Sequence, residues 1–424
     1  MTQRDRHFDH LNPLAEHPSP LLYEKGRTVC LALVILGAVG VFFGALMAGR
    51  QFYFSWLTGW AFCWCIMMGI LFFVMLHYLV GAGWDTVIRR PAEQILSAMP
   101  VIVLGMIPII IGMVNGQLYG WVHPESASPL LGFRAVFLSQ KFALVSLAIC
   151  GAIWLWLAYV FRRNSICQDA DGAGTWTISS QRWAAGGIFL YALSLTAAAV
   201  YLLMSLDHHW FSTMFGVYIW ASAVVGALAL MSLLVLKLRY RVLRQYIGSD
   251  TVHDIGKLTF TFNCFWGYIA FSQYFLIWYG NIPEETIWFL HRWTGTDQPA
   301  MWWPLALLFP TGMFLLPFLL LMSATMKRNP RMLATMCIIM LVSHFLQIYW
   351  IVQPESGTPA VRALMPPFAW IWIDLSVVLL IGGLSGIVFI SNFRKVALFP
   401  IMDPRLVEAL SAEHVEEIEH ADME

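Results

Sequence analysis

Charged side chains are scarce in this chain. Of its 424 residues, 12% are Asp, Glu, Lys or Arg, whereas about a quarter of the residues in a typical soluble domain are charged. Lys plus Arg and Asp plus Glu each number 25, so the net charge is zero and no basic surface for nucleic acid is indicated. Together with a hydrophobic content of 59%, the low charge content indicates an integral membrane protein rather than a soluble one.

Cysteine is also sparse, and its spacing argues against several redox centres. The seven cysteines include no C-x-x-C pair and no C-x-x-C-H haem attachment sequence. Six lie in apolar segments and Cys167 is expected in a loop, so packing as small apolar side chains is their default role. We therefore expect no metal site, no iron–sulfur cluster and no covalently bound cofactor. A haem held by two His is also not expected, since His344 has no obvious partner at its depth.

Long apolar segments are abundant. A bilayer core of ~30 Å is crossed by a helix of about 20 apolar residues, and ten segments meet that length. They are 28–48, 55–80, 95–114, 136–161, 183–205, 214–236, 258–280, 303–323, 332–352 and 369–391. The first follows 27 largely polar residues and lacks a small-residue cleavage site, so it is not expected to be a signal peptide. The sequence predicts an all-α polytopic membrane protein with ten transmembrane helices.

Lys and Arg are distributed unevenly between the two sides of the predicted membrane. Twenty lie on the side that holds both termini, and five lie on the other side. Because positively charged loops face the cytoplasm, both termini are expected there. The tail after Arg405 carries seven acidic residues and no Lys or Arg, which is typical of a solvated segment; contact with a basic partner is the alternative.

A short pattern occurs twice, with a shift of 157 residues. It consists of a Phe-Ser pair and glycines four and fourteen residues after the Ser: Phe54, Ser55, Gly59 and Gly69, then Phe211, Ser212, Gly216 and Gly226. Each copy opens a predicted helix of the same direction, and small residues let helices approach closely. We predict two parallel four-helix bundles, over 55–205 and 206–352. Flanking helices lie within 28–54 and 353–391, and the cytoplasmic ends are 1–27 and 392–424.

Three polar side chains fall deep in the predicted helices. His344 and Gln347 share a face of segment 332–352, and Asp374 lies near the outer end of segment 369–391. An ionised group at mid-membrane costs roughly 2.5–3.5 kcal/mol, so such residues are functional candidates. We interpret the three as the core of a proton path. The alternative is that each only forms a hydrogen bond to a neighbouring helix.

Further titratable residues are expected at the outer surface. Asp207 and His209 lie in the turn SLDHHW, directly before the second copy of the repeat. Glu284 and Glu285 follow Pro283, and this order favours the first turn of a short helix lying on the membrane surface. These four residues are candidates for a proton exit. A solvated turn and an anchoring helix with capping acids are the alternatives.

Several strings, in the same order along the chain, resemble a known family. They are MSLDHHWFSTMFGVY (204–218), WYGNIPEETIW (278–288), MKRNPRML (326–333) and DPRLVEAL (403–410). With them the chain resembles the F-type membrane subunit (ActF) of alternative complex III, a bacterial quinol:electron-acceptor oxidoreductase. That family belongs with the NrfD/polysulfide-reductase membrane subunits, which are built from two four-helix bundles. One departure is Tyr201, where the family pattern has Asp.

The resemblance implies a function. The complex oxidises menaquinol or ubiquinol near the outer face of a bacterial cytoplasmic (inner) membrane and releases protons outside. Electrons pass to an iron–sulfur subunit and then to c-type haem subunits, while a sister NrfD-like membrane subunit holds the principal quinol site. This chain is then expected to be a subunit of a respiratory or photosynthetic quinol:cytochrome c oxidoreductase that carries no redox centre and supplies a proton path. Whether the chain itself catalyses a reaction stays open.

The same resemblance implies contact with quinone as well as with partner subunits and membrane lipid. The candidate quinone contacts are Trp60, Trp64, Lys141, Tyr268 and Gln273. Packing explains the two Trp equally well, and a lysine whose charged end reaches the interface explains Lys141. Two other functions stay open: a secondary transporter, since parallel repeats suit alternating access, and a purely structural scaffold for redox subunits.

Overall fold

The structure, a computed structural model, describes residues 20–122, 133–241, 243, 246–293, 302–356, 368–406 and 408–409. Every regular element in these ranges is a helix, which confirms the all-α prediction. The segment 1–19 and the acidic tail from 410 onward lie outside the described residues.

The α-helices are α2 Pro20–Met47, α3 Arg50–Val80, α4 Thr86–Ile95, α5 Met99–Leu104, α6 Ile107–Val114, α7 Phe133–Phe137, α8 Gln140–Asp171, α9 Thr175–Leu202, α10 Phe215–Arg241, α11 Ser249–Gly280, α12 Pro283–Trp293, α13 Trp303–Pro310, α14 Leu316–Leu321, α15 Ala324–Arg328, α16 Pro330–Val352 and α18 Ile371–Phe393.

Nine helical segments in the described part of the chain are long and apolar enough to cross a membrane. They are Tyr23–Met47, Arg50–Val80, Thr86–Val114, Gln140–Asp171, Thr175–Leu206, Phe215–Arg241, Trp303–Leu321, Pro330–Glu355 and Ile371–Phe393. The chain is therefore a polytopic membrane protein. The remaining predicted segment, 258–280, forms most of α11, but Asn263 and Gln273 make it less apolar than the nine.

Most helices extend beyond the apolar segments that predict them. Helix α8 continues from Gln140 to Asp171 and ends at Gly172, whose φ of 67° is the left-handed conformation that closes many helices. Cys167, expected in a loop, consequently lies inside α8. Hydropathy detects only the part of a helix that faces hydrocarbon, whereas backbone hydrogen bonding continues into the polar flanks.

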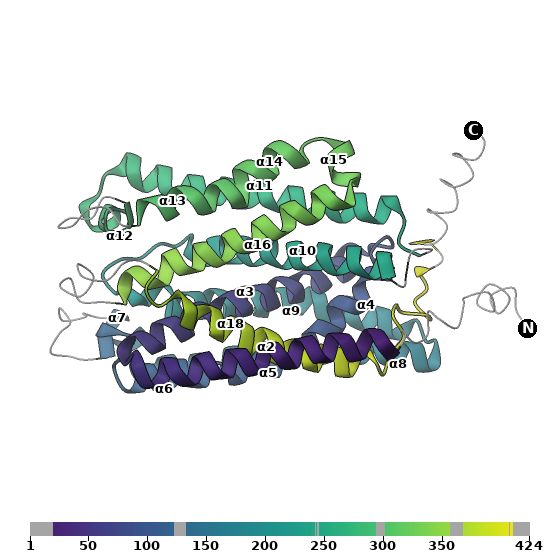
Figure 1. Ribbon diagram of the computed structural model, residues 1–424, viewed down its shortest axis with the longest axis horizontal. Coiled ribbons are helices and arrows are strands. Elements are labelled where there is room, and N and C mark those ends of the chain that lie inside the picture. Colours follow the sequence, from purple (N-terminus) through teal and green to yellow (C-terminus); the bar gives the residue numbers. More distant parts are fainter. Residues whose placement is uncertain are drawn as a thin grey trace, which may run out of the picture.

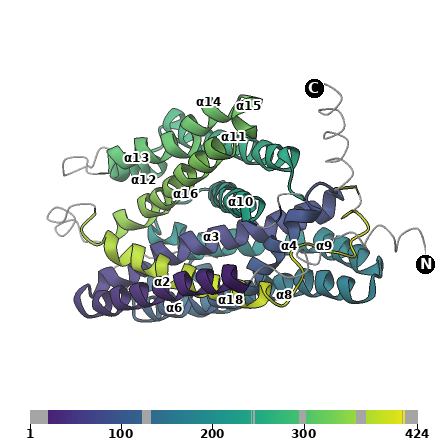
Figure 2. The ribbon, with the colours of Figure 1, turned by 45° about the vertical axis from the view of Figure 1, so that its right-hand side comes forward.

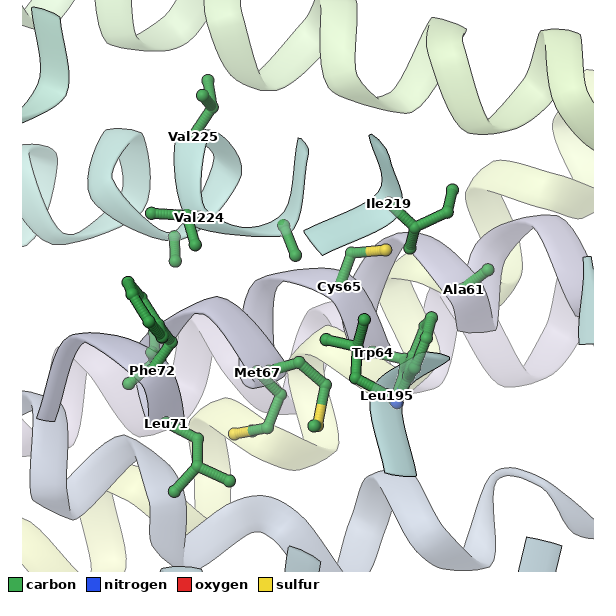
Figure 3. Close-up of a cluster of buried hydrophobic side chains, with 14 of the residues drawn as sticks. Ala61, Trp64, Cys65, Met67, Leu71, Phe72, Leu195, Ile219, Val224 and Val225 are labelled. Atoms are coloured by element: carbon green, nitrogen blue, oxygen red, sulfur yellow. The ribbon is translucent and has the colours of Figure 1, made fainter. Parts of the chain in front are cut away.

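The long helices lie side by side along one axis of the molecule (Figure 1). Helix α12 lies at one end of this bundle, and α4 and α15 lie at the other; we call these the α12 end and the α4 end. Helix α3 runs through the middle. In its buried apolar cluster Phe72 points toward α10, and Trp64 lies beside Leu195 of α9 (Figure 3). Figure 2 shows α10 between α3, α11 and α16.

Glycines permit the closest helix contacts. A Cβ atom on Gly69 of α3 would stand 2.2 Å from the Ala223 carbonyl oxygen of α10, so a larger residue would force the two helices to shift apart. Gly226, its counterpart in the repeat, lies on α10, where a Cβ would stand 2.9 Å from His344 Cδ2 of α16. The second glycine of each copy therefore makes room for the next helix, in the manner of small residues in membrane bundles.

The first and last membrane-spanning helices pack against each other. A Cβ atom added to Gly37 of α2 would stand within 3 Å of backbone atoms of Leu380 and Ser376 of α18, and one added to Gly40 would stand within 3 Å of the Ser376 side chain. The Tyr23 hydroxyl donates to the Phe393 carbonyl, so the start of α2 lies beside the end of α18. The two helices are therefore antiparallel neighbours.

Candidate functional site: an aromatic cavity and two buried polar clusters

A cavity of about 640 Å³ lies among α10, α11, α12, α13 and α16. Its walls are mainly aromatic, with Tyr218, Phe309 and Trp350 among them. The candidate quinone contacts Tyr268 and Gln273, both on α11, also line it. Tyr268 is 66% exposed on the outer surface of the helix bundle, whereas Gln273 is buried and donates to Ser212 Oγ at 3.2 Å. The cavity is thus a largely apolar space with few polar groups, and the exposed Tyr268 lies at its edge.

A local irregularity shapes one wall of this cavity. After Pro310, residues Thr311–Leu315 form a π-helical turn before α14 resumes the α-helix. Proline removes a backbone donor and disrupts the regular α-helical hydrogen bonds, and π-helical turns are frequent at functional sites. Phe309, Pro310 and Phe314 line the cavity at this irregularity.

The first buried polar cluster joins His344 and Gln347 through Ser222 of α10. Ser222 Oγ donates to Gln347 Oε1 at 2.6 Å and lies 2.8 Å from His344 Nδ1. Serine has one hydroxyl hydrogen, so Nδ1 must carry the proton of the His344–Ser222 bond. Nε2 of the neutral imidazole then holds a free lone pair, and it has no hydrogen-bond partner among the described residues. The core therefore contains an imidazole nitrogen with an unused lone pair.

This cluster reaches the cavity. Tyr218, four residues before Ser222 on α10, lines the cavity and interacts with the Gln347 side chain. Tyr218, Gln347, Ser222 and His344 thus form a continuous series of polar side chains, from the cavity wall to a fully buried imidazole.

The second buried polar cluster surrounds Asp374. Gln353 Nε2, just after α16, donates to Asp374 Oδ1 at 2.7 Å, and Ser55 Oγ of α3 donates to Asp374 Oδ2 at 3.4 Å. Gln353 also donates to Thr58 Oγ1, and Gln51 Nε2 donates to Gln353 Oε1 at 2.8 Å. Asp374 is fully buried, whereas Gln51 is only half-buried at the α12 end. Hydrogen bonds therefore connect the carboxyl to the surface.

His344, Gln347 and Asp374 do not form one hydrogen-bonded unit. The sequence predicts the three together, but among the described residues the Asp374 cluster has no hydrogen bond to Ser222, His344 or Gln347. The reason for the separation is geometric, because α18 and α10 lie against different faces of α3.

The predicted exit residues do gather at the α12 end. Trp210, next to the Asp207–His209 turn, donates from Nε1 to the Glu285 carbonyl at 3.1 Å and stacks on Trp288 of α12 with ring centroids 4.5 Å apart. His209 and Glu284 are exposed, and Glu285 is half-buried. Asp207 Oδ1 accepts from the His209 amide at 3.1 Å, so part of its role is to close the turn.

The neighbouring His208 is half-buried in the same turn. Burial lowers its pKa below the ordinary 6.5, and the nearby His209 lowers it further, while Asp207 and Glu355 act in the opposite direction. Around neutral pH the His208 ring is therefore uncharged and able to accept a proton.

Arg292 holds α12 against the bundle. Its side chain lies near the end of α12 and is only 1% exposed. The guanidinium lies 3.8 Å from the Trp288 ring centroid, and donates to the Ile351 carbonyl and to Glu355 Oε1, each at 3.0 Å. Because α16 ends at these residues, Arg292 supplies donors to carbonyls that have no intrahelical partner.

The other candidate quinone contacts lie away from the cavity. Trp60 and Trp64 are fully buried and stacked with centroids 5.5 Å apart, and Trp60 Nε1 donates to the Ile102 carbonyl. Lys141 is exposed at the start of α8. None of the three lines the cavity that contains Tyr268 and Gln273.

A group of buried charges at the α4 end was not predicted. Arg89, Arg90 and Glu93 of α4 are at most 1% exposed. From the sequence, Arg89 and Arg90 are expected in a loop and contribute only to the count of basic residues on the side that holds the termini. Asp85, Arg89 and Glu93 are spaced by four residues, as in ion pairs on one helix face, and this spacing is the signal that could have identified them.

No set of three or more His, Cys, Asp or Glu side chains in the described part of the chain is arranged to hold a metal ion. The aromatic cavity is a candidate ligand site in the part of the chain that the structure describes. No protein-family model matches the chain, and no curated protein matches it, so the functional argument rests on the fold and its buried groups.

Proposed function

We propose that this chain is a membrane subunit of a respiratory or photosynthetic quinol-oxidising complex, without a redox centre of its own, and that it binds a quinone ring in the aromatic cavity and carries protons toward the α12 end. In this proposal α11 is the tenth transmembrane helix, the helices form two parallel bundles, and the α12 end faces outward. Iron–sulfur, c-type cytochrome and sister membrane subunits are the partners.

The observation that carries the proposal is the polar series that begins in the cavity wall. A quinone is a flat, lipid-soluble ring with two carbonyl oxygens, so it needs an apolar, aromatic site with a few well-placed polar groups. Tyr218 and Gln273 are such groups. Behind Tyr218, the Gln347–Ser222–His344 series ends at an unpartnered imidazole nitrogen, which suits acceptance of a proton.

The Asp374 cluster is a second, separate element of the proposal, since no hydrogen bond among the described residues joins it to His344. Its carboxyl is bonded to Gln353, which accepts from the half-buried Gln51. A buried carboxyl with a hydrogen-bonded connection to one surface is typical of proton relays in membranes. A scaffold would not require such groups, and their full burial favours a functional role over mere packing.

Filling the cavity tests the proposal. Ala306 lines the cavity, so Ala306→Phe places a ring in the space that a quinone would occupy. The complex should be purified in mild detergent and extracted for quinone. We expect the variant to assemble but to lose bound quinone relative to the wild type. Ala192→Phe is the matched control, because Ala192 is exposed on α9 and lines no part of the cavity.

Two outcomes would overturn the proposal. One is retention of the same amount of quinone by Ala306→Phe and by Ala192→Phe. The other is purification of the wild-type chain without c-type haem or iron in the co-purifying subunits, which would favour a transporter.

A further inference from the structure

The buried charges at the α4 end form a compact unit, which we call the arginine cluster: Asp85, Arg89, Arg90, Glu93 and Asp403. Each is at most 2% exposed. Arg89 Nη2 donates to Asp403, which lies more than 300 residues later in the chain. Arg90 Nη2 donates to Asp169 of α8 at 2.6 Å, and Glu93 Oε1 accepts from the Tyr78 hydroxyl at 2.8 Å.

The cluster is poorly satisfied by protein groups. Three of its ion pairs, Arg89–Asp85, Arg89–Glu93 and Arg90–Glu93, are separated by 3.6–3.7 Å, which is too long for direct hydrogen bonds. Within the described residues the following buried atoms have no hydrogen-bond partner: both Asp85 carboxylate oxygens, Nε and Nη1 of Arg89, Nε and Nη1 of Arg90, and Glu93 Oε2.

Charged groups that are buried without partners are costly, and buried water is the usual means of satisfying several such groups at one place. Here donors and acceptors alternate within a few ångströms, so a single water molecule could bond to two or three of them. The same arrangement would be strongly unfavourable if the site were dry.

A segment of the chain after α18 covers the cluster. Residues 396–406, which we call the C-terminal strap, return across the α4 end (Figure 1). Leu398, Phe399 and Leu406 are fully buried, and Phe399 lies 5.1 Å from Tyr246 between ring centroids. Arg405 Nη1 donates to the Ala82 carbonyl beside α4.

Asp403 is the charged contact between the strap and the cluster. One of its oxygens accepts from Arg89, and the other accepts from the Arg405 amide at 2.9 Å. The strap thus places a carboxylate against one of the two buried guanidinium groups, while its apolar side chains anchor it on either side.

We propose that the arginine cluster is a hydrated site that binds several water molecules, and that the C-terminal strap is its cover, held closed by Asp403. The cover separates this water from the aqueous phase at the α4 end. Loss of the Asp403 charge leaves Arg89 without its closest counter-ion, and the strap opens more often.

Hydroxyl-radical footprinting of the full-length protein in nanodiscs tests the hydration. Buried tyrosines react quickly in this method when water is bound beside them, and Tyr78 is bonded to Glu93 within the cluster. Tyr191 is the internal reference, because it is equally buried at 1% exposure and its hydroxyl donates to the Met68 carbonyl in an apolar setting. We expect Tyr78 to be labelled severalfold faster than Tyr191; equal labelling of the two would show a dry site and overturn the proposal.

The cover is tested with Asp403→Asn, which keeps the shape of the side chain and removes its charge. Labelling of Tyr78 should rise severalfold, while labelling of Tyr191 should not change. Asp254→Asn is the matched control, because Asp254 pairs with Lys257 at the surface, at 2.5 Å, away from the strap. If Asp403→Asn leaves Tyr78 labelling at the wild-type rate, or if both tyrosines become reactive through general unfolding, the strap is not the cover.

Discussion

Arg292 offers a quantitative test of how α12 is held in place. Arg292→Met keeps an unbranched side chain of similar length but removes the charge and every donor. Its guanidinium has bonds to the carbonyls of Trp288, Trp350 and Ile351 at 3.0–3.3 Å, and one to Glu355. Removing one partner from a buried ion pair costs about 3–5 kcal/mol, and we expect a loss of that size in the free energy of unfolding.

The matched control is Arg50→Met. Arg50 lies at the same end of the bundle but is exposed, and its Nε donates to the Gln117 carbonyl at 2.8 Å. An exposed charged contact contributes less than about 1 kcal/mol. Unfolding of both variants by SDS in mixed micelles, followed by tryptophan fluorescence, measures the difference. A loss for Arg292→Met no larger than that for Arg50→Met would refute the anchoring role of Arg292.

Two further predictions concern helix contact and the polar series. Gly69→Ala places a methyl group 2.2 Å from the Ala223 carbonyl oxygen and should cost about 1–3 kcal/mol by overpacking. Gly186→Ala, with no heavy atom within 4 Å, should be neutral or stabilise by up to about 1 kcal/mol; equal effects in the SDS titration would contradict the close α3–α10 contact. Ser222→Ala breaks the link between His344 and Gln347, so it should slow quinol turnover severalfold while leaving bound quinone unchanged; normal turnover would exclude the series from proton transfer.

Much of the fold follows from hydropathy and glycine spacing. The apolar segments locate the nine membrane-spanning helices because hydrocarbon requires about 20 apolar residues in each. The second glycines of the repeat, Gly69 and Gly226, do lie at close helix contacts. Boundaries were less predictable: α8 extends to Asp171 through polar residues that hydropathy does not detect, and α4 begins at Thr86 and buries the charges of Arg89, Arg90 and Glu93.

The candidate site was predicted only in part. The neighbouring positions of His344 and Gln347 follow from helical spacing, and Tyr268 and Gln273 share one cavity. The Ser222 that joins His344 to Gln347 could not be predicted, because a serine in a membrane helix carries no signal of its partner. The bond between Arg89 and Asp403 spans 314 positions, and no local pattern predicts it.

The role of Asp374 in proton transfer is the central claim, and proton release per electron tests it most directly. Asp374→Asn retains an oxygen that can accept from Gln353, so the cluster and the assembly should persist. The measurement uses the purified complex in liposomes, with quinol as donor and Asp254→Asn as the control for a surface acid. The account predicts that Asp374→Asn lowers the number of protons released per electron while Asp254→Asn does not. Unchanged turnover and an unchanged proton yield in Asp374→Asn would contradict it.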